Sequence, residues 1–270
     1  MLKNNYKDKV AIITGGSGAL GFAMAKGLAL EGVKVALLGR TENTVQSKVD
    51  EINAMGGQAM ALVGDALDCQ AMEIAKNKVL QTWGKIDVLI NAAGGNIKGA
   101  TIQPEDSFFD MDIDDFDSVT NLNLKGTLIP TLVFGKEIAK QPNGSIINIS
   151  SIAAQQVLTR VVGYSASKAA VENFTKWLAV EMAQKLSTNL RVNAIAPGFF
   201  LGQQNKSLLL NEDGSLTERG KTIIANTPMK RFGKAEELVS TVLWLTSDAS
   251  SFVNGIVVHV DGGFSAFSGV

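Results

Sequence analysis

Short runs of apolar and β-branched residues alternate with longer amphipathic stretches along almost the whole chain. Seven of these runs are predicted to be strands, at residues 10–13, 33–38, 59–63, 86–93, 145–150, 190–196 and 255–260. Most are continuously apolar, which is typical of strands covered on both faces. Each gap is long enough for a crossover helix. The pattern therefore predicts an α/β fold with a doubly wound, seven-stranded parallel sheet in a single domain spanning residues 1–270.

One long irregular segment, at about residues 199–230, interrupts this alternation. It follows the sixth apolar run, and a connection of that length in a compact domain is more often functional than structureless. We therefore expect this segment to form a lid over a substrate site.

Composition and charge exclude several classes of protein. The formal net charge is −1 and no basic stripe is present, so there is no electrostatic reason to expect nucleic acid or an anionic membrane as a partner. The N-terminus is polar and no run of about 18 apolar residues occurs, which favours a cytoplasmic protein. The single cysteine, Cys69, and the single histidine, His259, are expected to be packed side chains, and we expect no metal site.

The sequence TGGSGALG, residues 14–21, follows the first predicted strand and has two possible registers. In one, Gly16, Gly18 and Gly21 match Gly-x-Gly-x-x-Gly, whose glycines let backbone N–H groups approach a pyrophosphate at a helix N-terminus. An acidic residue should then end the second strand, but that strand ends in Gly39. In the other register, Thr-Gly-x-x-x-Gly-x-Gly, Ala19 takes the place of the middle glycine. A glycine-rich turn without a ligand is the remaining alternative.

A serine, a tyrosine and a lysine follow the fifth predicted strand at chemically suggestive spacings. Tyr164 lies thirteen residues after Ser151, and Lys168 lies one helical turn after Tyr164, so that the ammonium and the phenol share a helix face. Lowering the ordinary phenol pKa of about 10 to near 7 requires roughly 4 kcal/mol of stabilisation, which a close cation can supply. Tyr164 could then exchange a proton with a substrate oxygen to which Ser151 donates a hydrogen bond.

With these motifs the chain resembles the short-chain dehydrogenase/reductase family over nearly its whole length. The shared motifs are the turn at 14–21, NAAG at 91–94, NLKG at 123–126, Ser151, YSASK at 164–168, APG at 196–198 and VDGG at 260–263. The resemblance implies a Rossmann-type fold and hydride transfer to or from a nicotinamide cofactor. It also implies that the second register applies, and that the family's subunits form a homotetramer.

The resemblance implies a set of site residues. The catalytic ones would be Asn123, Ser151, Tyr164 and Lys168. The cofactor would contact Gly15, Ser17, Ala19, Leu20, Gly21, Arg40, Asp65, Ala66, Asn91, Ala92, Gly94, Tyr164, Lys168, Pro197 and Gly198. Two positions depart from the family pattern, because Ala19 replaces a glycine and Gly202 replaces a threonine that contacts the carboxamide.

The end of the second strand indicates which cofactor is preferred. NAD-dependent members of the family usually have an aspartate where this chain has Gly39, and Arg40 follows. A missing carboxylate and a neighbouring guanidinium suit a 2′-phosphate, so we expect NADP, with NAD as the alternative. Gly18 stands where many NADP enzymes have a second basic residue.

Polar groups in two loops suggest the substrate. Asn96 and Lys98 follow NAAG, and Gln203 lies in the expected lid. Amides and cations suit a polyhydroxylated acid. The residue composition of these loops resembles that of the fructuronate reductase (D-mannonate oxidoreductase) and gluconate 5-dehydrogenase branch of the family. A reductase of 3-oxoacyl thioesters is the alternative enzyme. A regulator that senses NAD(P) is the non-enzymatic alternative, although such proteins typically lose the tyrosine or the lysine.

Overall fold

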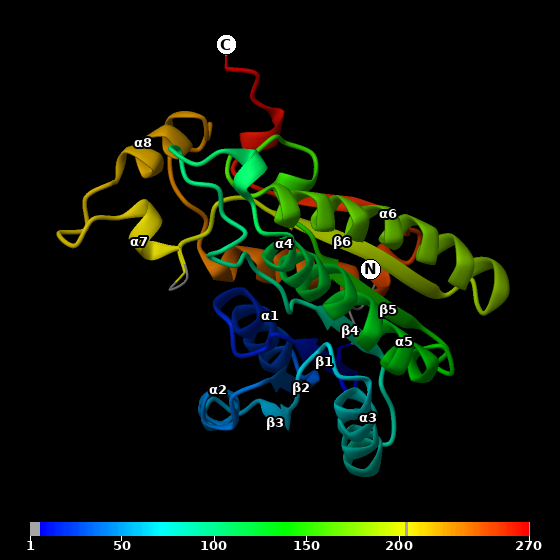
Figure 1. The fold of residues 1–270 in the computed structure, drawn as a ribbon. Helices are drawn as coiled ribbons and strands as arrows, with labels where there is room; N and C mark the ends of the chain where they lie inside the picture. Colours follow the sequence, from blue (N-terminus) through cyan, green and yellow to red (C-terminus); the bar gives the residue numbers. More distant parts are fainter. Residues whose placement is uncertain (1–5, 203–204, 270) are drawn as a thin grey trace.

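The sheet predicted from the apolar runs is present and is parallel throughout. The computed structural model describes residues 6–202 and 205–269, and its strands have the order β3-β2-β1-β4-β5-β6-β7 (Figure 1). They are β1 (Val10–Thr14), β2 (Lys34–Gly39), β3 (Gln58–Val63), β4 (Val88–Asn91), β5 (Gly144–Ile149), β6 (Leu190–Pro197) and β7 (Val257–Val260). The prediction of one doubly wound, Rossmann-type domain is confirmed.

Helices cover both faces of this sheet, which is why its strands are continuously apolar. The helices are α1 (Ala19–Leu30), α2 (Glu42–Ala54), α3 (Cys69–Trp83), α4 (Ile113–Thr120), α5 (Gly126–Ile138), α6 (Val162–Lys185), α7 (Lys206–Leu209), α8 (Glu218–Ala225) and α9 (Val239–Thr246). Buried residues of α1, α2 and α9 form one apolar cluster with the strands. Buried residues of α3, α5 and α6 form the other on the opposite face. None of the helices in the described part is long and apolar enough to cross a membrane.

The expectations for the single cysteine and the single histidine were wrong. Cys69 is exposed because it is the first residue of α3 and lies at the surface. His259 is exposed because β7 forms an edge of the sheet in this single chain. Among the described residues, no group of three histidine, cysteine or acidic side chains is placed to hold a metal ion.

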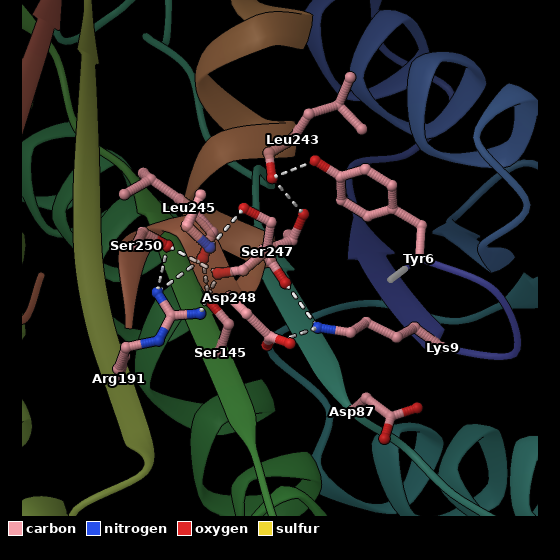
Figure 2. A network of polar contacts seen from close by, with 12 residues as sticks. Tyr6, Lys9, Asp87, Ser145, Arg191, Leu243, Leu245, Ser247, Asp248 and Ser250 are labelled. Carbon is pink, nitrogen blue, oxygen red and sulfur yellow. Dashed lines mark hydrogen bonds and ion pairs between the residues drawn. The ribbon is translucent and has the colours of Figure 1, made fainter. Parts of the chain in front are cut away.

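A polar network closes the end of the sheet at which β1, β5 and β6 begin (Figure 2). Arg191, at the start of β6 and only 7% exposed, donates hydrogen bonds to the carbonyls of Leu245 and Ser247 and to the Ser250 hydroxyl. Lys9 donates to the carbonyl of Thr246. Cations that bind the last carbonyls of α9 satisfy groups that lack partners within the helix. This network fastens α9 to the sheet.

The opposite end of the sheet contains the reversal in strand order, between β1 and β4. Thr14 and Asn91 are paired at the carboxyl ends of these two strands. The Thr14 hydroxyl accepts hydrogen bonds from the N–H groups of Ala92 and Ala93, both at 3.1 Å, and so holds the two strand ends together. In open α/β sheets, ligands bind at such a switch point.

The segment expected to form a lid contains structure of its own. It carries α7 and α8, which lie at one side of the molecule away from the sheet (Figure 1). Leu209 and Ile223 of this segment form a small buried cluster with Phe232, which follows it. Gln203 lies outside the described residues.

Candidate active site at the carboxyl ends of the strands

The glycine-rich turn is shaped by close backbone contacts. Gly15 has a φ of +63°, and a Cβ there would lie 2.7 Å from the carbonyl oxygen of Ala92. A Cβ on Gly21 would lie 2.4 Å from the carbonyl oxygen of Gly15. Gly18 has an ordinary extended backbone, and its nearest contact would be 3.3 Å away. The turn therefore requires glycine at positions 15 and 21 more strictly than at position 18.

The beginning of α1 provides free backbone donors. Gly18 is the N-cap and makes no side-chain capping bond. The first backbone bond of the helix runs from Phe22 N–H to the Gly18 carbonyl, so the N–H groups of residues 19–21 have no acceptor within the described part of the chain. Free N–H groups at a helix N-terminus bind phosphate well. This end of the turn fits the pyrophosphate of a dinucleotide.

The two departures from the family pattern lie opposite each other. A Cβ built on Gly202 would lie 3.8 Å from the Ala19 methyl group. A side chain at position 202 would therefore be in ordinary van der Waals contact with this methyl group. The structure brings the two substitutions together, which could not be inferred from positions so far apart in the chain.

Ser151, Tyr164 and Lys168 lie at the junction of β5 and α6. Ser151 follows β5 and caps a short helical turn, residues 152–154, while Tyr164 and Lys168 lie in the first two turns of α6. Lys168 is 4% exposed, and its Nζ donates a 2.7 Å hydrogen bond to the Ile149 carbonyl, 5.7 Å from the centre of the Tyr164 ring. The Ser151 hydroxyl lies close enough to the Tyr164 phenol to lower its pKa.

The pKa of Tyr164 differs from the expectation based on sequence. Burial raises the pKa of the phenol, and the smaller effect of the Ser151 hydrogen bond lowers it. Burial also lowers the pKa of Lys168 to about 8. Desolvation is therefore the largest influence on both groups. The expected lowering of the Tyr164 pKa by Lys168 is not found, because the pKa is raised.

Asn123 is fully buried beside the lysine. It lies in a π-helical turn, residues 121–125, between α4 and α5, and its amide bonds both the N–H and the carbonyl of Gly95. A Cβ on Gly94 would lie 2.7 Å from Asn123 Oδ1 and 3.2 Å from Lys168 Nζ. A wider turn of this kind often occurs at functional sites. Glycine at position 94 thus lets the loop lie against both polar side chains.

Residues expected near the adenosine half follow β2 and β3. A Cβ on Gly39 would lie 2.8 Å from Val45 and 3.0 Å from the Ser17 hydroxyl, so a larger residue does not fit without movement. Arg40 comes next and is exposed. After β3, Asp65 is half-buried and accepts the N–H of Leu67, and Ala66 is buried.

The remaining predicted residues lie at the ends of β4 and β6 or in the loop after β4. Asn91 is buried and donates to the Thr131 hydroxyl and to Asn148 Oδ1, so it links β4 to α5 and β5. Pro197 ends β6, and Gly198 bonds the Val260 carbonyl. Asn96 and Lys98 are both exposed in the loop after β4, and Asn96 donates to the Thr101 hydroxyl.

Two arginines that are far apart in the sequence, Arg160 and Arg219, lie near enough for their charges to interact. Arg160 lies four residues before Tyr164 and has a φ of +77°. Burial lowers the pKa of Arg219 in α8, and the charge of Arg160 lowers it further. Within the described ranges, neither guanidinium forms an ion pair. Nothing in the local sequence indicates this proximity.

Known proteins share this fold and these motifs. A family model described as enoyl-(acyl carrier protein) reductase matches residues 16–265. An uncharacterised oxidoreductase of Bacillus subtilis, UxuB, is 50% identical over all of this chain and 99% of its own. A crystal structure with bound NAD, from a Haemophilus influenzae protein provisionally ascribed D-mannonate oxidoreductase activity, has 42% identity and a TM-score of 0.93 over 98% of both chains. A 3-oxoacyl-[acyl-carrier-protein] reductase of Thermotoga maritima is 35% identical over 95% of this chain and 98% of its own.

The chain belongs to the short-chain dehydrogenase/reductase family. It is an oxidoreductase that depends on a nicotinamide cofactor.

Proposed function

We propose that the enzyme interconverts a carbonyl group and a secondary alcohol, with Tyr164 as the acid or base. The observation that carries this proposal is the convergence of Ser151, Tyr164 and Lys168 at one strand end. A bound nicotinamide cofactor supplies or accepts the hydride. In the direction of reduction, Ser151 binds the substrate oxygen and Tyr164 transfers its phenolic proton to it. Because burial raises the pKa of the phenol, Tyr164 is protonated at neutral pH, as proton donation requires.

Lys168 and Asn123 complete the proposed machinery. The Lys168 ammonium stabilises the phenolate left after proton transfer and would also hold the ribose of a bound cofactor. Asn123, next to Lys168 at Gly94, supports a path for replacing the proton from solvent. The charged ammonium therefore has its largest effect after proton transfer, when the phenol is negative.

The proposed cofactor site extends from the glycine-rich turn to the first two turns of α6, where Tyr164 and Lys168 lie. The free N–H groups of residues 19–21 would bind the pyrophosphate, with Gly15, Ser17 and the ends of β4 and β6 around them. Asp65 and Ala66 would lie near the adenine. The close approach of Gly15 to Ala92 and the open helix end support this assignment.

We propose NADP as the preferred cofactor. The absence of a side chain at Gly39, which Val45 and Ser17 enforce, leaves no carboxylate to repel a 2′-phosphate, and Arg40 is exposed beside it. NAD in the Haemophilus crystal structure favours the alternative. Affinities for NADPH and NADH should be measured for the wild type and for Arg40→Ala. We expect Arg40→Ala to weaken NADPH binding about tenfold and to leave NADH binding unchanged. A preference for NADH that persists in both proteins contradicts the proposal.

We propose a sugar acid such as fructuronate or mannonate as the substrate, and the segment 199–230 as its lid. Arg160 and Arg219, which have no carboxylate partners in the described structure, could receive the carboxylate of such an acid. Asn96, Lys98 and Gln203 would meet its hydroxyl groups. The activity ascribed to the Haemophilus relative supports this substrate class. The test is a panel of hexuronates, keto-gluconates and 3-oxoacyl thioesters with NADPH and NADH, in which we expect fructuronate to be reduced.

Reduction of 3-oxoacyl thioesters is the second candidate, because a relative 35% identical to this chain is named for it. Consumption of reduced cofactor with acetoacetyl thioesters, and none with hexuronates, would replace the first proposal by this one.

We also propose a homotetramer. Leu132 of α5 and Trp177 and Val180 of α6 are each more than half exposed, which supports packing of these helices against a second subunit. Light scattering of the purified protein measures the assembly directly, and a monomer would contradict the proposal.

A further inference from the structure

The turn that carries Ser151 is held by hydrogen bonds on both sides of the serine. Ser150 precedes it, and its N–H bonds the Ile195 carbonyl of β6 at 2.8 Å. The Ser151 hydroxyl oxygen accepts the N–H of Ala153 at 3.2 Å. Gln155 ends the turn, and its N–H bonds the Ile152 carbonyl. These local bonds shape the turn but do not connect it to the helix that carries Tyr164.

Glu172 of α6 binds two side chains of the turn and so connects it to this helix, and the Ser150 hydroxyl also lies 3.5 Å from the Lys168 carbonyl. Its Oε1 accepts a 2.9 Å hydrogen bond from the Ser150 hydroxyl, and its Oε2 accepts a 2.8 Å hydrogen bond from Gln155 Nε2. One carboxylate therefore binds the residue before Ser151 and a residue four positions after it.

The carboxylate of Glu172 is buried, with only 5% of the residue exposed. Burying a carboxylate is costly unless its oxygens are bonded, and both are bonded here. Among the described residues, no cation forms an ion pair with it, and Lys168, one turn earlier on α6, instead binds the Ile149 carbonyl. A valine or leucine would fill such a position at lower cost, so the carboxylate serves another purpose.

We propose that Glu172 is a positioning residue that holds Ser151 against Tyr164. Because Glu172 is on the same helix as Tyr164 and Lys168, its two hydrogen bonds set the distance between the serine hydroxyl and the phenol. The inference rests on the role proposed above for Ser151. A serine displaced by about 1 Å loses much of its effect on the transition state while substrate binding changes little.

The decisive experiment is a double-mutant cycle with Glu172→Ala and Ser151→Ala. Rates are measured with the carbonyl compound that the substrate panel identifies. Each rate is divided by the concentration of cofactor-binding sites in that protein preparation. We expect Glu172→Ala to lower kcat about 10- to 100-fold with little change in cofactor affinity. In the Ser151→Ala background we expect no further loss. Losses that multiply in the double variant, or full activity of Glu172→Ala, overturn the inference.

Two further variants separate positioning from general damage. Glu172→Gln keeps a carbonyl oxygen that can accept the hydrogen bond from the Ser150 hydroxyl. Its new amide N–H can donate to Gln155 once the Gln155 amide rotates to present its oxygen. The activity of Glu172→Gln should therefore be much closer to wild type than that of Glu172→Ala. Glu181→Ala, on the same helix and paired only with Lys185, should behave as the wild type. If Ser151→Ala itself is fully active, the proposed function fails instead, which is a different outcome from additive losses.

Hydrogen exchange gives a test that needs no substrate. The backbone amides of residues 153–156 should exchange faster in Glu172→Ala than in the wild type, while those of β7 should be unchanged. Unchanged exchange in the turn would show that Glu172 does not hold it.

Discussion

Replacing Lys168 by methionine should make the cofactor-free protein more stable while abolishing its activity. Burial lowers the pKa of Lys168 from 10.5 to about 8, which corresponds to ~3 kcal/mol of unfavourable free energy for holding the charged lysine at pH 7. Methionine keeps most of the apolar stem and removes the charge. It also leaves the Ile149 carbonyl without its donor, which costs about 1 kcal/mol. We expect a net gain of about 2 kcal/mol in the free energy of unfolding at pH 7.

The pH dependence of this gain has a definite sign. Between about pH 8 and 10.5, the unfolded wild type holds a proton on Lys168 that the folded protein has released. Wild-type stability therefore rises with pH over this range, and the advantage of the methionine variant should shrink. Urea unfolding at pH 7 and pH 9, at a fixed protein concentration and without cofactor, measures both effects. Lys176→Met, at an exposed position of the same helix, is the control. A methionine variant less stable than the wild type at pH 7, with a difference independent of pH, refutes the reasoning.

Two other predictions concern the turn and the network at the opposite end of the sheet. Gly15→Ala should abolish cofactor binding and lower the free energy of unfolding by about 2 kcal/mol, because its Cβ would meet the neighbouring loop at a positive φ. Gly18→Ala should keep both properties, and equal effects of the two changes, measured by cofactor fluorescence and thermal unfolding, would refute this account of the turn. Arg191→Leu should cost about 3 kcal/mol in urea unfolding because three acceptors lose their donor, whereas cofactor affinity in the folded protein should be unchanged.

The fold was largely predictable because its signals are local. Continuous apolar runs identify strands covered on both faces, and glycine at Gly15 and Gly21 reflects backbone contacts that few other residues permit. The positions of Ser151, Tyr164 and Lys168 were also predictable, since a strand end and a helical turn bring them together.

Properties that depend on three-dimensional surroundings were not predictable. The raised pKa of Tyr164 results from burial, which the spacing to Lys168 does not reveal. The pairing of Glu172 with Gln155 joins a helix to a turn 17 residues earlier, with no sequence motif to mark it. The facing positions of Ala19 and Gly202 likewise follow only from the folded chain.

The central claim is that Tyr164 transfers the proton in a reaction that depends on a nicotinamide cofactor, and Tyr164→Phe tests it most directly. This change removes one oxygen atom and leaves the ring to pack as before. We expect the wild type to reduce a carbonyl substrate of the panel, and the variant still to bind reduced cofactor while its kcat falls at least about 1,000-fold. A variant that retains activity within about tenfold of the wild type would contradict the claim.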